Sequence, residues 1–324
     1  MTRVLITGAS GFIGSALLSR LAADRGFVVR AASRRHEWRP PGGVLTVHVN
    51  GQATDTDWKS AIDGINVVIH TAARVHVTKD RALDPLSEFR HVNVDGSMNL
   101  ARQAAAAGVR RFLFVSSIKV NGEATLPGSP FTADDAPAPV DPYGISKHEA
   151  ESGLYRLGVE TGMEIVVIRP PLVYGPGVKG NFLALMHWLS RGIPLPLASI
   201  RNRRSLVALK TLTDLIVTCI RHPAAANQTF LVSDGEDLST PDLILRLAQA
   251  MGRPARLFPF PSALLHAGAS LFGRRDAAQR LCGSLQVDIS KTRNVLGWTP
   301  SIDIDGGLAE VARWYLENDR MKVS

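Results

Sequence analysis

The feature that most constrains this chain is a glycine-rich turn near its N-terminus, Thr-Gly-Ala-Ser-Gly-Phe-Ile-Gly at residues 7–14. An apolar run at residues 4–6 precedes the turn and a helical pattern over residues 15–21 follows it, which predicts a strand, a phosphate-binding turn and a helix. Gly8 permits the tight turn, Gly11 lets the backbone approach a pyrophosphate, and Gly14 lets the helix pack closely on the strand. Free N–H groups at the helix start then face the anion.

Strands alternate with helices through the first half of the chain, which predicts an α/β fold with a doubly wound parallel sheet. Further predicted strands are residues 28–33, 44–49, 67–70, 111–116 and 164–169, and predicted helices are residues 58–62, 88–107 and 142–161. Proline and glycine become frequent after residue 169, with helices around residues 182–191 and 241–251. We therefore expect a dinucleotide-binding domain over residues 1–169, with a return segment at 207–236, and a smaller C-terminal substrate lobe mainly over residues 170–324.

Composition limits the class of protein. The chain has 324 residues, 45% of them hydrophobic, which is enough for a substantial core. Two cysteines are too few for a disulfide framework or a cysteine metal site, so we expect no metal and a reducing compartment. The chain starts with a predicted strand rather than a signal segment, and no apolar stretch approaches the roughly 20 residues of a membrane span. We therefore expect a cytoplasmic protein without an integral membrane span.

The net charge of +8 favours an anionic partner. The sequence contains no nucleic-acid recognition motif, so we expect no nucleic-acid partner. Arginines gathered around the phosphates of a cofactor and a substrate explain the charge better, and a basic surface that keeps the protein soluble is the alternative.

Two further motifs suit acid–base chemistry. Tyr143 and Lys147 are four residues apart on a predicted helix, so they share one face. A nearby ammonium favours the phenolate and lowers the tyrosine pKa from about 10, which makes the phenol usable as an acid or base near neutral pH. Ser116 and Ser117 stand at the end of the strand at residues 111–116, where a hydroxyl points into the ligand crevice and can hydrogen-bond a reacting oxygen. Each signal also occurs by chance, but three in this order reinforce one another.

Together these motifs resemble the extended short-chain dehydrogenase/reductase family, in its NAD-dependent epimerase/dehydratase branch. The resemblance covers nearly the whole chain and extends to residues 70–73, 93–100, 116–117, 169–177 and 288–300. It implies a Rossmann-type domain with a nicotinamide cofactor, a lobe that closes over a nucleotide-diphosphate sugar, and a homodimer through the helices at 88–107 and 142–161. The most similar group acts on UDP-N-acetyl sugars in surface-polysaccharide synthesis, as 4-epimerases or 4-ketoreductases.

The resemblance also implies roles for single residues. Tyr143 would exchange a proton with the sugar hydroxyl, Ser117 would hydrogen-bond the same oxygen, and Lys147 would hold the nicotinamide ribose and tune Tyr143. The residues expected to bind the cofactor are Gly8, Gly11, Phe12, Ile13, Gly14, Ser33, Arg34, Ala72, Ala73, Asn93, Tyr143, Lys147 and Pro170. The residues expected to bind the substrate are Arg74, Ser117, Tyr143, Asn181, Arg204 and Arg280, with Arg204 at the diphosphate.

The sequence departs from the family pattern at three places. Asn121 stands where the family usually has a tyrosine, and Ala208 stands where it usually has a histidine after the diphosphate arginine. The usual Gly-Asp pair after the third strand is replaced near Asn50-Gly51, which affects adenine recognition.

The end of the second strand bears on the choice of cofactor. An enzyme that selects NAD normally has a carboxylate there, whereas this chain has Ser33-Arg34-Arg35. An arginine at this place can pair with the 2′-phosphate of NADP, and a basic surface turn is the alternative. We therefore favour NADP(H), with NAD(H) as the alternative.

The cofactor bears on the reaction. A 4-epimerase keeps NAD bound and returns the hydride to the other face of the sugar, whereas a reductase consumes fresh NADPH at each turnover. We therefore rank a 4-ketoreductase of a UDP-sugar, derived from an N-acetylhexosamine, narrowly above a 4-epimerase. A non-catalytic NADP-sensing module on the same fold is a distant alternative, because such a module would be expected to lose the tyrosine or the lysine.

Overall fold

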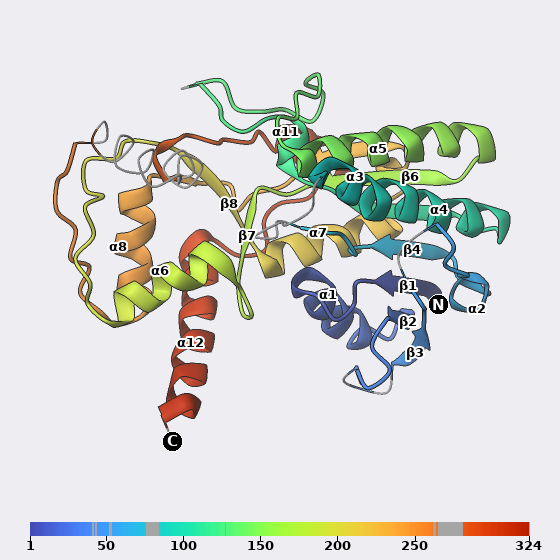
Figure 1. The fold of residues 1–324 in the computed structure, drawn as a ribbon, viewed down its shortest axis with the longest axis horizontal. Coiled ribbons are helices and arrows are strands. Elements are labelled where there is room, and N and C mark those ends of the chain that lie inside the picture. Colours follow the sequence, from blue (N-terminus) through green and yellow to red (C-terminus); the bar gives the residue numbers. More distant parts are fainter. Residues whose placement is uncertain are drawn as a thin grey trace.

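The computed structural model describes residues 1–40, 42, 44–51, 54–75, 84–126, 128–261, 264 and 281–323. A seven-stranded parallel sheet forms one half of the molecule, and a three-stranded sheet surrounded by helices forms the other (Figure 1). The larger sheet has the strand order β3-β2-β1-β4-β5-β6-β9. The winding direction reverses between β1 and β4, and ligands of such sheets bind beyond the strand ends at this point. The predicted doubly wound parallel sheet is confirmed.

The larger sheet is buried on both faces, so its central strands are almost entirely apolar. Its strands are β1 (Thr2–Thr7), β2 (Phe27–Ser33), β3 (Leu45–His48), β4 (Val67–His70), β5 (Arg111–Val115), β6 (Glu164–Arg169) and β9 (Gln228–Leu231). Helices α1 (Phe12–Ala22) and α7 (Leu209–Arg221) pack on one face. Helices α2 (Lys59–Ile62), α4 (Gly96–Ala106) and α5 (Pro142–Thr161) pack on the other face, and α3 (Pro85–Arg90) leads into α4 (Figure 1).

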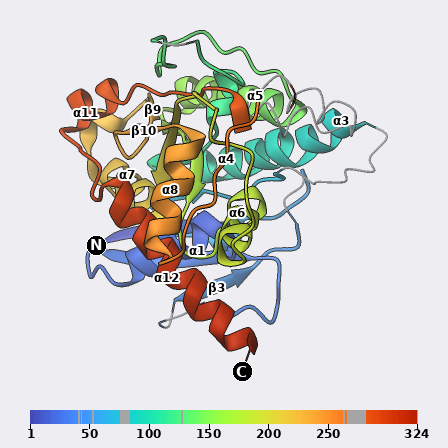
Figure 2. The ribbon, with the colours of Figure 1, turned by 90° about the vertical axis from the view of Figure 1, so that its left-hand side faces the viewer.

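The smaller sheet has the order β10-β8-β7. Its strands are β7 (Leu172–Tyr174), β8 (Arg204–Ala208) and β10 (Asp237–Leu238). Three helices that face the viewer in Figure 2 pack against it, namely α6 (Gly180–Ser190), α8 (Thr240–Ala250) and α12 (Ile304–Val323). The shorter α11 (Ser290–Leu296) contacts β9 of the larger sheet.

Two features differ from the sequence prediction. The helix predicted over residues 88–107 is interrupted by one π-helical turn, η2 (His91–Asp95), between α3 and α4. The three-stranded sheet was not predicted, because its strands have only two to five residues and no long alternating pattern.

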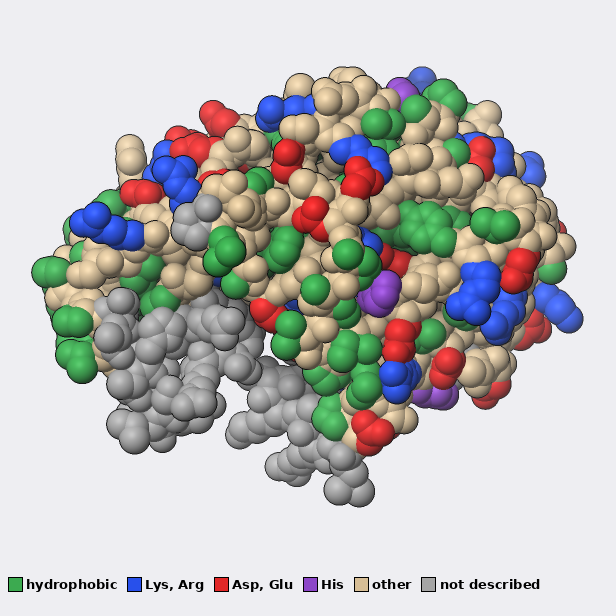
Figure 3. Space-filling model, turned by 90° about the horizontal axis from the view of Figure 1, so that it is seen from above, with side chains coloured by type: hydrophobic (Ala, Val, Ile, Leu, Met, Phe, Trp, Pro, Cys, Tyr) green, Lys and Arg blue, Asp and Glu red, His purple; other side chains and the backbone are tan. Residues whose placement is uncertain are grey.

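The described surface is mixed in charge. On the face shown in Figure 3, Lys and Arg side chains are interspersed with Asp and Glu side chains, so the net charge of +8 does not form one continuous basic patch among the described residues there. Among the helices of the described chain, none is long and apolar enough to cross a membrane.

Candidate active site

The glycine-rich turn between β1 and α1 has the geometry of a pyrophosphate site. Gly8 has a positive φ of 68°, and a Cβ atom on Gly14 would lie only 2.1 Å from the Gly8 carbonyl oxygen. The amide of Gly11 closes the turn with a 2.8 Å hydrogen bond to that same oxygen. No side chain caps the first turn of α1, so the N–H groups of Phe12 and Ile13 remain available to an anion. These residues therefore fit the diphosphate of a dinucleotide.

The segment after β4 lies directly against this turn. A Cβ atom on Gly8 would approach the amide nitrogen of Ala72 to 2.6 Å, and Ala72 and the half-buried Ala73 continue this segment. Asn93, on the π-helical turn, holds the segment in place: it accepts from the Arg74 amide at 2.8 Å and donates to the Arg74 carbonyl at 3.1 Å. Because π-helical turns often occur at functional sites, this turn is a signal that sequence periodicity could not reveal.

Tyr143 and Ser117 meet at the start of α5. Asp141 caps this helix by accepting from the Gly144 amide at 2.6 Å, which fixes Tyr143 in the first turn. A hydrogen bond joins the Tyr143 and Ser117 side chains, and Ser117 itself lies just after β5. Burial and, less strongly, the charge of Asp141 raise the pKa of Tyr143 to about 12, and the hydrogen bond with Ser117 opposes both effects.

Lys147 lies one turn further along α5 and is buried. Its ammonium donates to the Val115 carbonyl at 2.8 Å and lies 3.8 Å from the centre of the Phe114 ring. Burial lowers the pKa of Lys147 to about 7, and the carboxylate of Glu151 counteracts this effect. The structure thus brings Ser117, Tyr143 and Lys147 together at the carboxyl end of β5.

A buried polar network supports the other side of Lys147. Arg169, at the end of β6, donates to Glu151 from Nη2 at 2.6 Å and to Asn121 Oδ1 from Nη1 at 3.0 Å. Asn121 in turn donates to the Thr132 carbonyl at 2.9 Å. Asn121, which stands where the family usually has a tyrosine, therefore links Arg169 to the segment that follows β5.

A buried histidine connects the ends of β1 and β4. His70 shares a 2.6 Å hydrogen bond with the Thr7 hydroxyl through Nδ1 and a 2.9 Å bond with the Ser97 hydroxyl through Nε2. Burial and, less strongly, the charge of Lys147 lower the pKa of His70 to about 3. The imidazole is therefore neutral at physiological pH and serves as a hydrogen-bonding link beneath the site.

Comparison with known proteins agrees with a dinucleotide site at the glycine-rich turn. Residues 4–233 match the model of the NAD dependent epimerase/dehydratase family. The chain belongs to this family. It is 47% identical over 315 residues to a UDP-glucose 4-epimerase from Vibrio cholerae, covering 97% of this chain and 95% of that relative. The resemblance to the extended short-chain dehydrogenase/reductase family is thereby confirmed, and the chain is an enzyme of its epimerase/dehydratase branch.

Solved structures share the fold along the whole chain. The UDP-glucuronic acid 4-epimerase from Bacillus cereus in complex with NAD has a TM-score of 0.78 at 19% identity, covering 98% of this chain and 99% of its own. RMD from Pseudomonas aeruginosa complexed with NADPH has a TM-score of 0.73 at 21% identity, and the match covers 97% of this chain and 99% of the RMD chain. Structures with this fold thus hold either nucleotide.

Of the remaining predicted cofactor residues, Ser33 and Arg34 lie at the end of β2, whereas Pro170 lies beside the turn that follows Ser117. Ser33 is buried, and its hydroxyl accepts from the Arg35 amide at 3.1 Å, while Arg34 is exposed. They adjoin a groove of about 490 Å³ lined by residues 35–38. Pro170 is buried after β6, and its carbonyl accepts from the Ile118 amide at 3.0 Å.

Two predicted substrate residues lie in the half of the molecule that contains the smaller sheet. Asn181 is exposed at the start of α6, and Arg204 begins β8 and donates to the Gly283 carbonyl at 3.0 Å. Arg280 lies outside the described residues.

Sequence reasoning missed Phe89, whose ring packs edge-on to Tyr143 with 6.0 Å between ring centres. The guanidinium of Arg74 lies 5.6 Å from the centre of the same ring, so Phe89 contacts both Arg74 and Tyr143. The missed polar residues are Lys119, Asp141, Glu151 and Arg169. Asp141 directly before Pro142 was a readable helix-start signal.

Proposed function

We propose that this enzyme transfers a hydride at C4 of a UDP-sugar, and that it is a UDP-sugar 4-epimerase. The observation that carries the proposal is the hydrogen bond between Ser117 and Tyr143, one helical turn from the buried Lys147. The 47% identity to a relative named UDP-glucose 4-epimerase supports epimerisation as the reaction.

Each catalytic residue has one task in this mechanism. The glycine turn would hold the diphosphate of a nicotinamide cofactor, with Lys147 and the segment around Ala72 beside it, and the cofactor would supply the chemistry of accepting and returning the hydride. Tyr143, as the phenolate, accepts the proton of the C4 hydroxyl and later returns it. Ser117 donates a hydrogen bond to the same oxygen and holds it beside the phenol. Lys147, as the ammonium, favours the phenolate over the neutral phenol during proton transfer.

A second candidate is a 4-ketoreductase that uses NADPH. It is favoured by the end of β2, where the Ser33 hydroxyl bonds to the backbone of Arg35 and no carboxylate occurs at residues 33–35. The NAD bound in the structure of the UDP-glucuronic acid 4-epimerase from Bacillus cereus supports NAD instead. An N-acetylhexosamine as the sugar, a homodimer through α4 and α5, and a cytoplasmic location also remain proposals.

The test uses the purified protein with whatever nucleotide copurifies, identified by mass spectrometry. UDP-glucose and UDP-N-acetylglucosamine are supplied separately without added cofactor, and a UDP-4-keto-6-deoxy sugar is supplied with NADPH. We expect conversion of at least one of the first two to its C4 epimer. NADPH consumption with the keto sugar, in the absence of any epimer, would establish the reductase instead.

A matched pair of variants tests the acid–base role. Tyr143→Phe is expected to lower turnover by roughly 10²–10⁴-fold, the usual contribution of a general acid–base group, while leaving nucleotide binding unchanged. Tyr155→Phe is the control, because Tyr155 lies on the same helix, its pKa is also raised to about 12 by burial, and its hydroxyl bonds to Thr229 instead. Equal turnover in the two variants would falsify the assignment, and nucleotide binding without any turnover would favour a sensing module.

A further inference from the structure

Lys119 lies between the two candidate catalytic segments. Its ammonium contacts Glu123 at 2.8 Å and forms an ion pair with Asp141, the residue that caps α5. The side chains of Lys119 and Asp141 are each only 19% exposed, so solvent screens this pair less than it screens a surface pair.

The backbone of Lys119 makes two further contacts with the site. Its amide donates to the Ser117 hydroxyl at 3.3 Å, which orients that side chain. Its carbonyl oxygen lies where a Cβ atom on Gly144 would approach to 2.8 Å, so the turn after β5 packs directly on the first turn of α5. Lys119 thus contacts the segment of Ser117 and the segment of Tyr143 at once.

The charges around Tyr143 define what Lys119 can do there. Asp141 at the cap and Lys147 one turn along α5 carry the charges nearest to Tyr143 in sequence; further along the helix, Glu149 pairs with Arg90 and Glu151 pairs with Arg169. On the segment after β5, the charged groups are Lys119 and its partner Glu123. From α3, Phe89 packs on the Tyr143 ring and also contacts Arg74, whose guanidinium lies 3.7 Å from the Glu88 carboxylate. The charge of Asp141 raises the pKa of Tyr143, and the cation that pairs with Asp141 is Lys119.

We propose that Lys119 is a positioning residue: it neutralises Asp141 at the start of α5, so that the cap of the catalytic helix does not suppress formation of the Tyr143 phenolate. Asp141 is required because its carboxylate fixes the helix start, but its charge opposes the chemistry two residues away. Lys119 separates these two effects, because it balances the charge and leaves the hydrogen bond to Gly144 intact. This inference rests on the proposed acid–base role of Tyr143.

The test is the pH dependence of kcat, measured with the substrate that the proposed-function assay identifies. Lys119→Met keeps most of the side-chain stem and removes the charge. It is expected to shift the limb of the kcat–pH profile that reports formation of the Tyr143 phenolate to higher pH, by on the order of one unit, with little change in KM. On that limb, a shift of one unit lowers the rate about tenfold at fixed pH. Lys119→Arg restores the charge and is expected to return the limb toward its original position.

Two further variants separate an electrostatic role from a structural one. Asp141→Asn retains a good capping side chain and is expected to move the limb toward lower pH. In that background, Lys119→Met should lose most of its effect, because the charge it balances is gone. Glu123→Gln removes the other partner of Lys119 and should leave the limb in place.

The contrary outcomes are distinct. If Tyr143→Phe abolishes turnover but Lys119→Met lowers kcat without moving the limb, the Lys119 proposal is wrong and the proposed function stands. If Tyr143→Phe retains turnover, the proposed function fails, and the Lys119 proposal fails with it.

Discussion

At the scale of single residues, the site depends on charges that are buried but paired. Lys147, Glu151 and Arg169 are each at most 5% exposed, and one carboxylate lies among two cations. Burial alone would discharge Lys147, and Glu151 is the group that opposes this loss. The same carboxylate accepts hydrogen bonds from Nε and Nη2 of Arg169. Glu151 therefore stabilises the fold and also helps to keep Lys147 charged.

Glu151→Gln tests this double role. Removing one partner of a buried ion pair leaves the other charge uncompensated, so we expect a loss of about 3–5 kcal/mol in the free energy of unfolding, measured with urea. The matched control is Glu149→Gln, because Glu149 forms the same kind of paired contact with Arg90, with a closest distance of 2.5 Å, but both side chains are about a third or more exposed. That change should cost less than about 1 kcal/mol. Equal losses would show that burial does not govern these pairs.

At the scale of elements, the glycine turn is the part of the chain where shape matters most. A Cβ atom on Gly14 would meet backbone atoms of Gly8 at 2.1 and 2.7 Å, and backbone cannot move aside as a side chain can. We expect Gly14→Ala to destabilise the protein by about 1–3 kcal/mol. Because α1 would be displaced from the turn, nucleotide affinity should also fall about tenfold or more, which corresponds to at least about 1.4 kcal/mol.

The control for this change is Ser15→Ala, which removes an exposed hydroxyl that donates to the Phe12 carbonyl in the same helical turn at 3.2 Å. Affinity for the nucleotide, measured by calorimetry, should be nearly unchanged in that variant. Normal affinity in Gly14→Ala would contradict the role assigned to the turn.

Elements also show what the sequence can and cannot predict. The limits of α5 and β6 agree with the prediction to the residue, because Pro142 marks the start of the helix and Gly162 its end, at a φ of 78°. The π-helical turn was missed because it adds one residue per turn without changing the composition. The Lys119–Asp141 and Glu151–Arg169 pairs were missed because their partners are separated by 22 and 18 residues, and only the packing of η3 (Ile118–Val120) and β6 against α5 brings them together.

At the scale of the whole molecule, two packed cores share structural elements. Alternate residues of β8 face different cores: Val207 belongs to the core of the larger sheet, whereas Leu206 and Ala208 belong to the core of the smaller one. Phe12, at the start of α1, packs against the core of the smaller sheet, so the cofactor turn itself touches the half that carries Asn181 and Arg204. We therefore expect the two halves to unfold as one unit.

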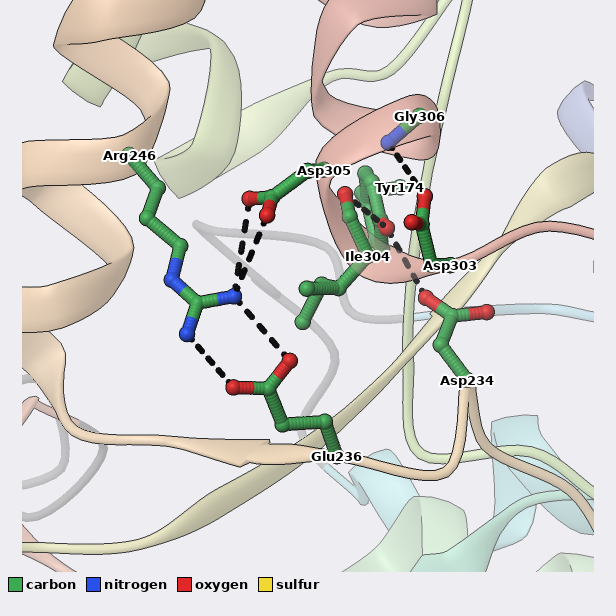
Figure 4. A network of polar contacts seen from close by, with 8 residues as sticks. All are labelled: Tyr174, Asp234, Glu236, Arg246, Asp303, Ile304, Asp305 and Gly306. Atoms are coloured by element: carbon green, nitrogen blue, oxygen red, sulfur yellow. Dashed lines mark hydrogen bonds and ion pairs between the residues drawn. The ribbon is translucent and has the colours of Figure 1, made fainter.

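The buried hydroxyl of Tyr174 links β7 to the start of α12 and to the segment after β9 through hydrogen bonds. The Tyr174 hydroxyl, on β7, lies 2.8 Å from Asp234 Oδ2 and 3.3 Å from the Ile304 carbonyl at the start of α12, as Figure 4 shows. Asp234 also accepts from the Ala208 amide at 2.9 Å, where α7 begins. Beside it, Arg246 pairs with Glu236 and Asp305 in a network that is largely exposed to solvent and therefore contributes less.

Tyr174→Phe removes the hydroxyl and its two hydrogen bonds but keeps the aromatic ring. Asp234 loses one of its partners in a buried setting, so we expect the free energy of unfolding to fall by about 1–3 kcal/mol. Tyr315→Phe is the matched control in the same core: its hydroxyl lies 3.1 Å from the Ser190 hydroxyl and 3.3 Å from His187 Nδ1, both longer than the Tyr174–Asp234 bond, and its loss should cost no more than about 1 kcal/mol. Urea unfolding is followed by circular dichroism and by tryptophan fluorescence, because Trp58 lies in the core of the larger sheet and Trp314 packs against that of the smaller one. Coincident transitions in Tyr174→Phe, at a lower midpoint, would agree with shared cores, whereas two separate transitions would show that the halves are held together mainly by this one hydroxyl.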